Sequence, residues 1–516
     1  MNPRLIHAPD SAIAARRDLQ ALLRHRELQL DACNRSFTVI GHGSVGAKAE
    51  QLMQKAWAIE QAGFVMNPRV ALAMGFFDAF KERNGITEAI KRGASTSELR
   101  DIFREARFSK EEMDVFAKIA KRFEGTPLAV RSSAHGDCRG TGAYMSTFCL
   151  ADVVRIAKAI KRVLYSEFSE DAVDFRRDAG LPVGMAVIIE PVFGQVFQFE
   201  FGEHKTNCVA PQCGGNGFTS TSWGKGLIRL VGGLPTQAVK GGGFNVEEGS
   251  GATFGSILTI RRYEEFRKAD PRASFYKNYD ALMRWIHGKG ISRLNGSETD
   301  IVPLSSLRDL GVDWLFERLK SLERILGKPQ YVEWALMDRG GRPEAVILQI
   351  ADVELKKDFY EFSNAGKTFV KSISVVGTGQ RVCDGLVFAW NPDDVRLLYE
   401  YNQKHGNYII VYSDRLTTTL LRRGPCLRYS DLSNSSVVTE LYGGLERSDP
   451  PIAHFQGMLE QTGKLFMVVN RPDWDMLERF KREIHVGDSN LVIYDAKFRV
   501  TTSERQQKGI IELIDS

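Results

Sequence analysis

The sequence predicts an α/β (α+β) protein with a large N-terminal part and a smaller, separate α/β domain at its C-terminal end. A strand over 36–40, SFTVI, runs through a glycine-rich loop into a helix. Two apolar strands over 331–337 and 345–352 are joined by DRGGRPE, which has the chemistry of a hairpin turn. After residue 370 short apolar strands such as 408–414 recur, and helices separate some of them. We take 370–516 as a domain of its own.

Composition and charge exclude several classes of protein. The chain has 516 residues, of which 43% are hydrophobic and 26% are charged, as in globular proteins of about three domains. The net charge of +5 is small for this length and gives no argument for a nucleic-acid partner. There is no apolar run of 18 residues and no N-terminal apolar segment, so we expect a cytoplasmic protein without membrane contact. The seven cysteines form no CxxC motif, which argues against a zinc site or a disulfide framework.

Periodicity predicts the remaining elements of the N-terminal part. We expect helical segments over 9–32 and 76–124 and a strand over 127–133. A long loop should follow this strand, and after it a helix over 151–168 and a buried strand over 185–193. The segment 210–256 is rich in glycine, which indicates either backbone that approaches a ligand or a set of hairpin turns.

The loop GHGSVGAK (41–48) fits two nucleotide-binding patterns. It matches GxGxxG, with Glu60 near the place of a ribose-binding acid, and it nearly matches a P-loop, although Ala47 displaces the lysine. In either case free N–H groups and Lys48 at a helix N-terminus suit an anion. The alternative is an ordinary tight turn between a strand and a helix.

Four segments, in this order, resemble the ATP-grasp nucleotide-binding domain of the pyruvate phosphate dikinase and phosphoenolpyruvate synthase family. They are GHGSVGAKAEQL, PLAVRSS followed by TGAYMST, MAVIIEPVFG, and YVEWALMDRGGRPEAVILQ; WGKGLIRLVGGLPTQAV resembles a glycine-rich loop of the same domain. The resemblance covers about 36–353. It implies a two-lobed ATP-grasp domain, with an N-terminal lobe over 1–125 that carries a helical insertion and a second lobe over 126–355.

The resemblance also implies which residues bind ATP and Mg²⁺. Lys48 and Arg131 would neutralise part of the triphosphate, and Arg131 would also take part in catalysis. Backbone N–H groups over 140–147, a segment that includes Gly142 and Thr147, would cover the phosphates. Glu190 would lie at the adenine, and the implied metal ligands are Glu333 and Gln349.

The C-terminal part, 370–516, resembles the mobile phosphohistidine domain of the same family, after a linker over 356–369. The similar segments are VVGTGQRVCDG, YIIVYSD, SVVTELYGG, IAHFQGMLEQTGKLFMVV and VGDSNLVIYDAKFRV. His454 stands where that family has its phosphorylated histidine, at the start of a helix. A helix N-terminus keeps the imidazole neutral and nucleophilic, and it favours the attached phosphoryl group. The alternative is a half-buried histidine that opens a surface helix.

The chain departs from the family pattern in four places, one of which is a longer segment between Gly444 and His454 with Asp449-Pro450-Pro451 inserted. Tyr331 stands where an acid is usual, Ala351 and Asp352 replace Arg-Pro, and Ile452-Ala453 replaces Thr-Ser. The chain also stops after the histidine domain, where the dikinases carry a pyruvate-binding barrel. We therefore expect the phosphoryl acceptor to bind elsewhere on this chain or on a separate acceptor-binding subunit.

These observations predict an ATP-dependent dikinase-type phosphotransferase. It would pass a phosphoryl group from ATP through His454 to an unidentified acceptor, yielding AMP and phosphate. A second hypothesis, motivated by Tyr331 and Ala351, is a nucleotide-binding or partner-binding protein that keeps the fold with weakened turnover. A third is a Rossmann-type oxidoreductase that uses the 41–48 loop.

Overall fold

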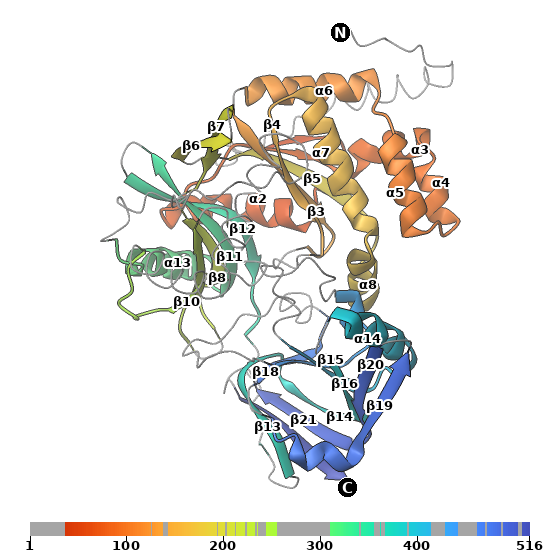
Figure 1. The fold of residues 1–516 in the computed structure, drawn as a ribbon. Helices are drawn as coiled ribbons and strands as arrows, with labels where there is room; N and C mark the ends of the chain where they lie inside the picture. The colour runs from red at the N-terminus through yellow and green to blue at the C-terminus, as the bar shows by residue number, and fades with distance from the viewer. Residues whose placement is uncertain are drawn as a thin grey trace.

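The computed structural model shows mixed sheets with helices around them (Figure 1). The predicted helix over 9–32 and most of the predicted linker over 356–369 lie outside the residues that the structure describes. The described residues are 37–124, 126–137, 143–192, 195–201, 204–211, 213–221, 224–232, 235, 244–254, 310–339, 342–355, 362, 367–389, 392–413, 429–441, 462–469, 472–486, 489–503 and 508–515.

The first sheet has five strands in the order β1-β2-β5-β3-β4. Their bounds are Phe37–Ile40 for β1, Arg69–Leu72 for β2, Pro127–Ala134 for β3, Ser146–Leu150 for β4 and Met185–Pro191 for β5. Only β1 and β2 pair in parallel, and the other pairs are antiparallel. A Rossmann fold needs a parallel sheet, so the hypothesis of a Rossmann-type oxidoreductase is wrong. The strands predicted over 36–40, 127–133 and 185–193 are confirmed.

Helices cover both faces of this sheet. Helix α2 (Gly46–Gln61) packs on β3 and β5, and α7 (Val153–Tyr165) packs on β3, β4 and β5. The predicted helical stretch over 76–124 consists of short helices around a phenylalanine-rich core. They are η2 (Met74–Phe77), α3 (Asp78–Arg83), α4 (Ile86–Lys91), α5 (Thr96–Glu105) and α6 (Lys110–Arg122). Helix α6 begins with a capping box in which Ser109 and Glu112 bond each other's backbone N–H.

The second sheet has the order β10-β9-β8-β11-β12. Its strands are β8 (Cys213–Phe218), β9 (Leu227–Gly232), β10 (Phe244–Glu247), β11 (Gln330–Arg339) and β12 (Arg342–Asp352). Strands β11 and β12 form the predicted hairpin, and α13 (Asp313–Leu326) shares a buried core with this sheet. A separate two-stranded sheet pairs β6 (Gln195–Phe201) with β7 (His204–Ala210).

The described part of the glycine-rich segment is mainly antiparallel strand rather than loop. Strands β8, β9 and β10 pair in sequence within it. A Cβ on Gly215 would lie 1.8 Å from the carbonyl oxygen of Arg229, so glycine permits close strand packing here. Of the two interpretations of this segment, the described residues fit the hairpin interpretation.

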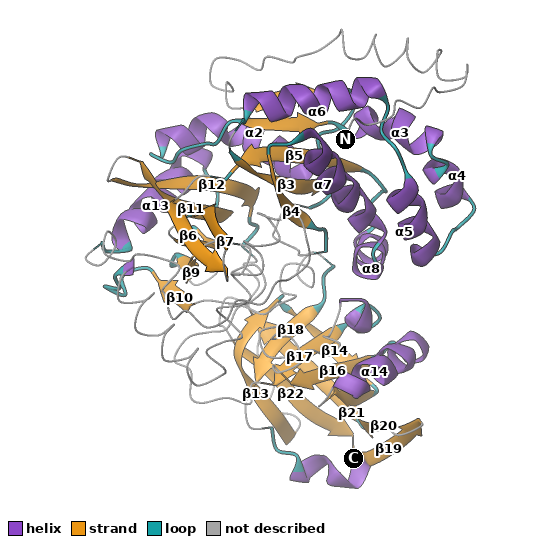
Figure 2. Ribbon diagram, turned by 45° about the horizontal axis from the view of Figure 1, so that its top comes forward, coloured by secondary structure: helices purple, strands orange, loops and turns teal. Residues whose placement is uncertain are grey.

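The third sheet takes all its strands from 367–515. Its order is β14-β21-β22-β13-β18-β17-β16-β15-β20-β19, and β15 to β18 run parallel. Together with α14 (Pro392–Lys404) it lies at the end of the molecule opposite to α6 (Figure 2). The bounds are β13 Lys367–Val376, β14 Gly379–Cys383, β15 Gly385–Ala389, β16 Tyr408–Ser413, β17 Val437–Leu441, β18 Leu465–Val469, β19 Lys481–Val486, β20 Ser489–Tyr494, β21 Lys497–Ser503 and β22 Lys508–Asp515.

The C-terminal part contacts the N-terminal part at α8 (Glu170–Ala179). The hydroxyl of Tyr429, in η6 (Tyr429–Leu432), donates to Asp178 Oδ2 at 2.8 Å, and the N–H of Ser430 donates to Asp171 Oδ1 at 3.0 Å. The ring of Tyr429 also meets Phe175 edge to face, with centroids 6.1 Å apart. Buried apolar residues on the two sides of this contact belong to one continuous cluster.

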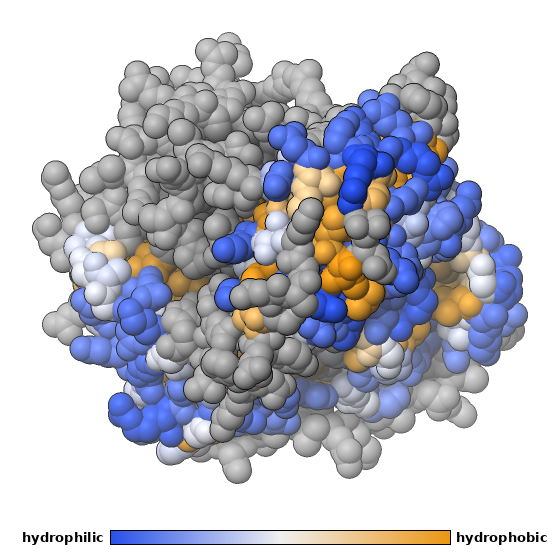
Figure 3. Space-filling view, turned by 90° about the horizontal axis from the view of Figure 1, so that it is seen from below, coloured by the Kyte–Doolittle hydropathy of each residue, from blue (hydrophilic) through white to orange (hydrophobic). Residues whose placement is uncertain are grey.

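The surface at the end that carries the C-terminal sheet mixes hydrophilic and hydrophobic residues, with the hydrophobic ones in small areas between hydrophilic ones (Figure 3). The exposed large hydrophobic residues of the described ranges include Trp57 and Val382. None of the helices that the structure describes has both the length and the apolar character needed to cross a membrane.

Candidate active site

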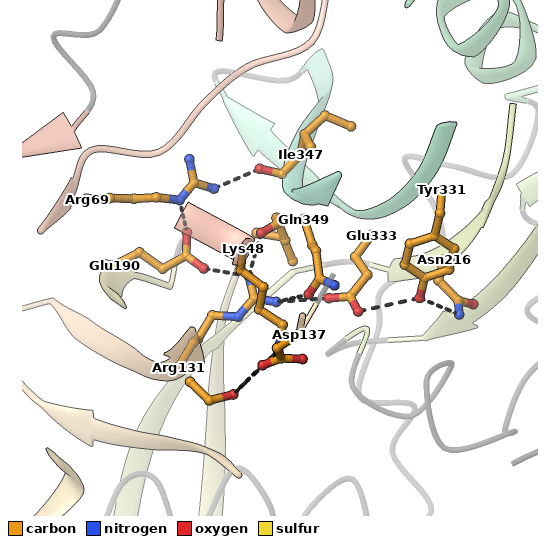
Figure 4. A network of polar contacts seen from close by, with 12 residues as sticks. Lys48, Arg69, Arg131, Asp137, Glu190, Asn216, Tyr331, Glu333, Ile347 and Gln349 are labelled. Carbon is orange, nitrogen blue, oxygen red and sulfur yellow. Dashed lines mark hydrogen bonds and ion pairs between the residues drawn. The ribbon is translucent and has the colours of Figure 1, made fainter. Parts of the chain in front are cut away.

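Arg131 is at the centre of a polar network between the first two sheets (Figure 4). It lies on β3 with its side chain 11% exposed, and its guanidinium reaches across to β11 and β12. Nη2 lies 2.9 Å from Glu333 Oε2 and 3.4 Å from Gln349 Oε1, while Nη1 lies 3.1 Å from Glu190 Oε1. Four predicted site residues, two from each sheet, are thus brought together.

A second arginine supports the same network. Arg69 on β2 is fully buried, and its Nε donates to Glu190 Oε2 at 2.6 Å. Register places Arg131 beside Ile188 on β5, and Glu190 is two residues further along the same face. The Glu190 carboxylate is therefore held between two guanidinium groups.

A β-bulge on β12 completes the contact between the sheets. Pairing shifts between Glu333 and Trp334 of β11, which leaves Leu348 of β12 without a partner in the ladder. The carbonyl of Leu348 accepts from Arg131 Nη1 at 2.6 Å, and the carbonyl of Ile347 accepts from Arg69 Nη2 at 2.7 Å. The bulge thus turns backbone acceptors toward the arginines of the first sheet.

Charge and burial set the protonation of this network. Burial alone would lower the pKa of Arg131, but the carboxylates of Glu190 and Glu333 outweigh burial and raise that pKa. Burial lowers the pKa of Arg69, and Glu190 offsets part of the effect. An arginine stays charged at neutral pH even so, and the network is an array of ion pairs.

Tyr331 lies beside Glu333 on β11 and is 4% exposed. Its hydroxyl is 3.5 Å from Glu333 Oε1 and accepts a hydrogen bond from Asn216 Nδ2 at 3.0 Å. Burial, with a further contribution from Glu333, raises the pKa of Tyr331 well above its ordinary value. The phenol therefore remains protonated and supplies no negative charge where the family resemblance leads us to expect an acid.

Lys48 lies next to this network in the first turn of α2 and is 7% exposed. Its Nζ forms an ion pair with Asp137 Oδ2 at 2.6 Å and lies 3.4 Å from the hydroxyl of Ser132. The predicted phosphate-binding cation is thus matched by an acid in the loop that follows β3.

The glycine loop before α2 packs closely on β3. Gly46 has φ +75°, and a Cβ there would lie 1.8 Å from the carbonyl oxygen of Ser133. The N–H of Gly46 donates to Ser44 Oγ, and the N–H of Ala49 donates to Ser133 Oγ. Serine hydroxyls therefore bond two of the N–H groups that open α2.

The other predicted residues are not placed in the network. Thr147, whose backbone N–H is the predicted group, lies on β4 and pairs with Val130 of β3, next to the pair of Arg131 with Ser146. Gly142 and His454 lie outside the residues that the structure describes.

Sequence reasoning missed Arg69, Asp137 and Asn216. A charged residue within the apolar run RVAL was a usable signal for Arg69, because such a residue is buried only when it is paired. Asp137 and Asn216 gave no comparable signal, since their roles depend on the fold of a loop and on the pairing of β8 with β11.

Lys55 anchors α2 to the second sheet at a distance from Arg131. Its Nζ lies 2.6 Å from Asp352 Oδ1 and 2.8 Å from Gln330 Oε1. Lys328 pairs with the other oxygen of Asp352 at 2.5 Å. These contacts outweigh the effect of burial and lower the pKa of Asp352 to about 2. Asp352 thus forms ion pairs with Lys55 and Lys328, away from the network around Arg131.

Comparison with known proteins agrees with the geometry of the site. The family model described as pyruvate phosphate dikinase, AMP/ATP-binding domain, matches residues 42–359. This range contains the second sheet, all strands of the first sheet except β1, and all the residues of the network. A search of curated proteins finds no significant match.

Proposed function

The chain belongs to the family of the pyruvate phosphate dikinase AMP/ATP-binding domain, and from this we propose that it is a phosphotransferase of the dikinase type. ATP would bind between the first two sheets, beside Lys48 and Arg131. The observation that carries the proposal is the convergence of Arg131 with Glu190, Glu333 and Gln349 from two separate sheets. Such a junction between lobes is a common place for a nucleotide site.

The cations of the site are already paired, so triphosphate binding is an exchange of partners. Phosphate oxygens would take up donors of Arg131 and Lys48 that now bond Glu333 and Asp137. A guanidinium suits this exchange because its fork can hold two phosphate oxygens at once. Glu190 would keep its place, because Arg69 holds its second oxygen.

Mg²⁺ fits the residues of this site as an ion that arrives with the nucleotide. Within the described ranges there is no group of three His, Cys, Asp or Glu residues that could hold a metal. Glu333 is the carboxylate that would bind Mg²⁺, and the predicted second ligand, Gln349, is its partner on the neighbouring strand. When bound, Mg²⁺ supplies charge neutralisation on the phosphate oxygens.

We further propose that His454 is the nucleophile. Its imidazole would displace AMP at the β-phosphorus, and water would then release the terminal phosphoryl group as inorganic phosphate. The phosphoryl group that remains on His454 would pass to the acceptor, and the imidazole would be regenerated. One histidine must then visit two sites, which requires movement of the C-terminal domain away from α8.

ATP labelled in separate experiments at the β- and γ-phosphorus tests this sequence. We expect acid-labile β-label on the protein, production of AMP, and loss of the label in His454→Ala. His485→Ala, a change on β19 within the same domain, serves as the control and should keep the label. ADP as the product, or unchanged labelling of His454→Ala, would contradict the assignment.

A binding protein with weakened turnover is the second candidate. The protonated phenol of Tyr331 beside Glu333 favours it, because a neutral group there leaves one carboxylate for the metal. Nucleotide binding by the wild-type chain without AMP formation, with a range of acceptors, is the result that would select this candidate.

A further inference from the structure

Three polar side chains form a straight row across the second sheet. Glu333 on β11 pairs directly with Asn216 on β8 and with Gln349 on β12. Residues directly opposite in antiparallel strands point to the same face, and Arg131 marks this face as the one toward the first sheet. Asn216, Glu333 and Gln349 are 5%, 6% and 0% exposed. A row of amide, carboxylate and amide is thus buried at the junction of the two sheets.

Each amide in the row has one polar atom without a hydrogen-bond partner among the described residues. The atoms are Asn216 Oδ1 and Gln349 Nε2. A buried polar atom without a partner costs about 1–3 kcal/mol, and native proteins keep few of them unless water, an ion or a ligand meets them. Among the described residues, an acceptor without a partner, Asn216 Oδ1, therefore lies on one side of Glu333, and a donor without a partner, Gln349 Nε2, lies on the other. We call these two the open atoms of the row.

Tyr331 determines which atom of Asn216 is open. Its phenolic hydrogen is directed to Glu333 Oε1, so its oxygen accepts from Asn216 Nδ2. This bond turns Asn216 Oδ1 away from the phenol. At the other end of the row, Gln349 Oε1 accepts from Arg131, which leaves Nε2 as the open atom.

We propose that Asn216 is a ligand for the divalent cation that accompanies the nucleotide, and that Tyr331 is its positioning residue; this inference rests on the proposed ATP-dependent function. Asn216 Oδ1 and the Glu333 carboxylate are hard oxygen ligands of the kind that Mg²⁺ and Mn²⁺ prefer. Gln349 Nε2 donates to a phosphate oxygen of the same nucleotide. The neutral amide on β8 thus supplies an oxygen ligand that Tyr331 cannot supply.

Binding of Mn²⁺ in the presence of saturating α,β-methylene-ATP tests the assignment without turnover. Free Mn²⁺ is measured by electron paramagnetic resonance on the full chain. We expect Asn216→Ala to raise the Kd for Mn²⁺ about tenfold, as loss of a weak oxygen ligand does. Asn216→Asp keeps an oxygen at the same place and should bind Mn²⁺ at least as tightly as wild type.

Asn402→Ala is the matched control. Asn402 is also a buried amide, 3% exposed, but it lies on α14 and donates to the carbonyl of Asp431. It should leave the Kd for Mn²⁺ unchanged. Tyr331→Phe should weaken Mn²⁺ binding less than Asn216→Ala does, and it should have no further effect when Asn216 is already alanine. That non-additivity marks Tyr331 as acting through Asn216.

Three results would overturn the inference. In the first, Asn216→Ala binds Mn²⁺ like wild type while Glu333→Gln does not, which removes Asn216 from the cation site but leaves the proposed ATP function intact. In the second, Asn216→Ala weakens binding of the analogue equally with and without Mn²⁺, which assigns Asn216 to the nucleotide. In the third, the wild-type chain fails to bind the analogue at all, and then the proposed function fails as well.

Discussion

The Glu190 carboxylate should be the group on which the contact between the first two sheets most depends. It is 2% exposed and forms ion pairs with Arg69 at 2.6 Å and with Arg131 at 3.1 Å. Glu190→Gln keeps the size of the side chain and removes its charge. Arg131 would retain Glu333, but Arg69 would lose the carboxylate with which it pairs and would keep neutral partners, among them the carbonyls of Asn67 and Ile347 and the ring of Phe37.

The expected loss follows from that unpaired charge. Removing one partner of a buried ion pair typically costs about 3–5 kcal/mol, because the remaining charge stays out of water. Amide exchange in peptides that cover β3 and β12 should then become at least about a hundredfold faster, since 1.4 kcal/mol is a factor of ten. Hydrogen exchange measured by mass spectrometry reports this loss at the two sheets themselves.

Glu98→Gln is the matched control for this experiment. Glu98 also pairs with an arginine, Arg92, but the two side chains are 42% and 54% exposed. An exposed pair contributes less than about 1 kcal/mol, so exchange around α5 should change little. If Glu190→Gln affected β3 and β12 no more than Glu98→Gln affects α5, the reasoning about the buried carboxylate would be refuted.

Three further predictions concern the scaffold around the site. In urea unfolding, Gly46→Ala should lower the free energy of unfolding far more than Gly85→Ala does. The two glycines have φ of +75° and +70°, which costs an alanine about 1–2 kcal/mol at either position, but only at Gly46 would the Cβ collide with backbone. Equal losses in the two variants would show that the collision is relieved. The folded-state pKa of Asp352 is lowered from 3.8 to about 2, so its contribution to stability is present above pH 4 and is lost as pH falls toward 2. The urea midpoint of Asp352→Asn should therefore change less with pH over that window than the midpoint of the wild type does. The same pH dependence in both proteins would exclude the mechanism. Asp178→Asn removes the carboxylate charge that accepts a hydrogen bond from Tyr429, and a hydrogen bond to a charged group contributes about 1.5–3 kcal/mol. The distribution of distances between spin labels on α8 and α14 should therefore become broader. An unchanged distribution would show that the contact at α8 does not depend on that charge.

Much of the fold could be predicted from local patterns. Two apolar segments joined by a turn-forming sequence predicted the β11–β12 hairpin, and the strand, loop and helix around 41–48 are present as expected. What the sequence could not predict is which strands are neighbours. Strands β1 and β2 lie before residue 125 and β3, β4 and β5 lie after it, yet they form one sheet. Such pairing is non-local and leaves no periodic signal in either segment.

The residues of the candidate site also divide into those that the sequence singles out and those that only strand pairing reveals. The residues that could be selected stand in segments that resemble those of a known family, namely Lys48, Arg131, Glu190, Glu333 and Gln349. The structure brings four of them together around one guanidinium. Asn216 stands in a run of glycines, and nothing in that run says that its side chain faces Glu333.

The charges of the site explain how one network serves both the fold and the proposed chemistry. Lys48, Arg69 and Arg131 face Asp137, Glu190 and Glu333, so three positive charges are balanced by three negative ones. Without nucleotide this balance avoids buried unpaired cations, which would be costly. In the proposed function, a triphosphate that enters would displace carboxylates from the cations, and the freed carboxylate of Glu333 would then need a positive partner. A divalent cation that arrives with the nucleotide would supply that charge, and Asn216 Oδ1 lies on the neighbouring strand. Cation and nucleotide should therefore bind cooperatively, because the cation would offset part of the negative charge that the nucleotide brings.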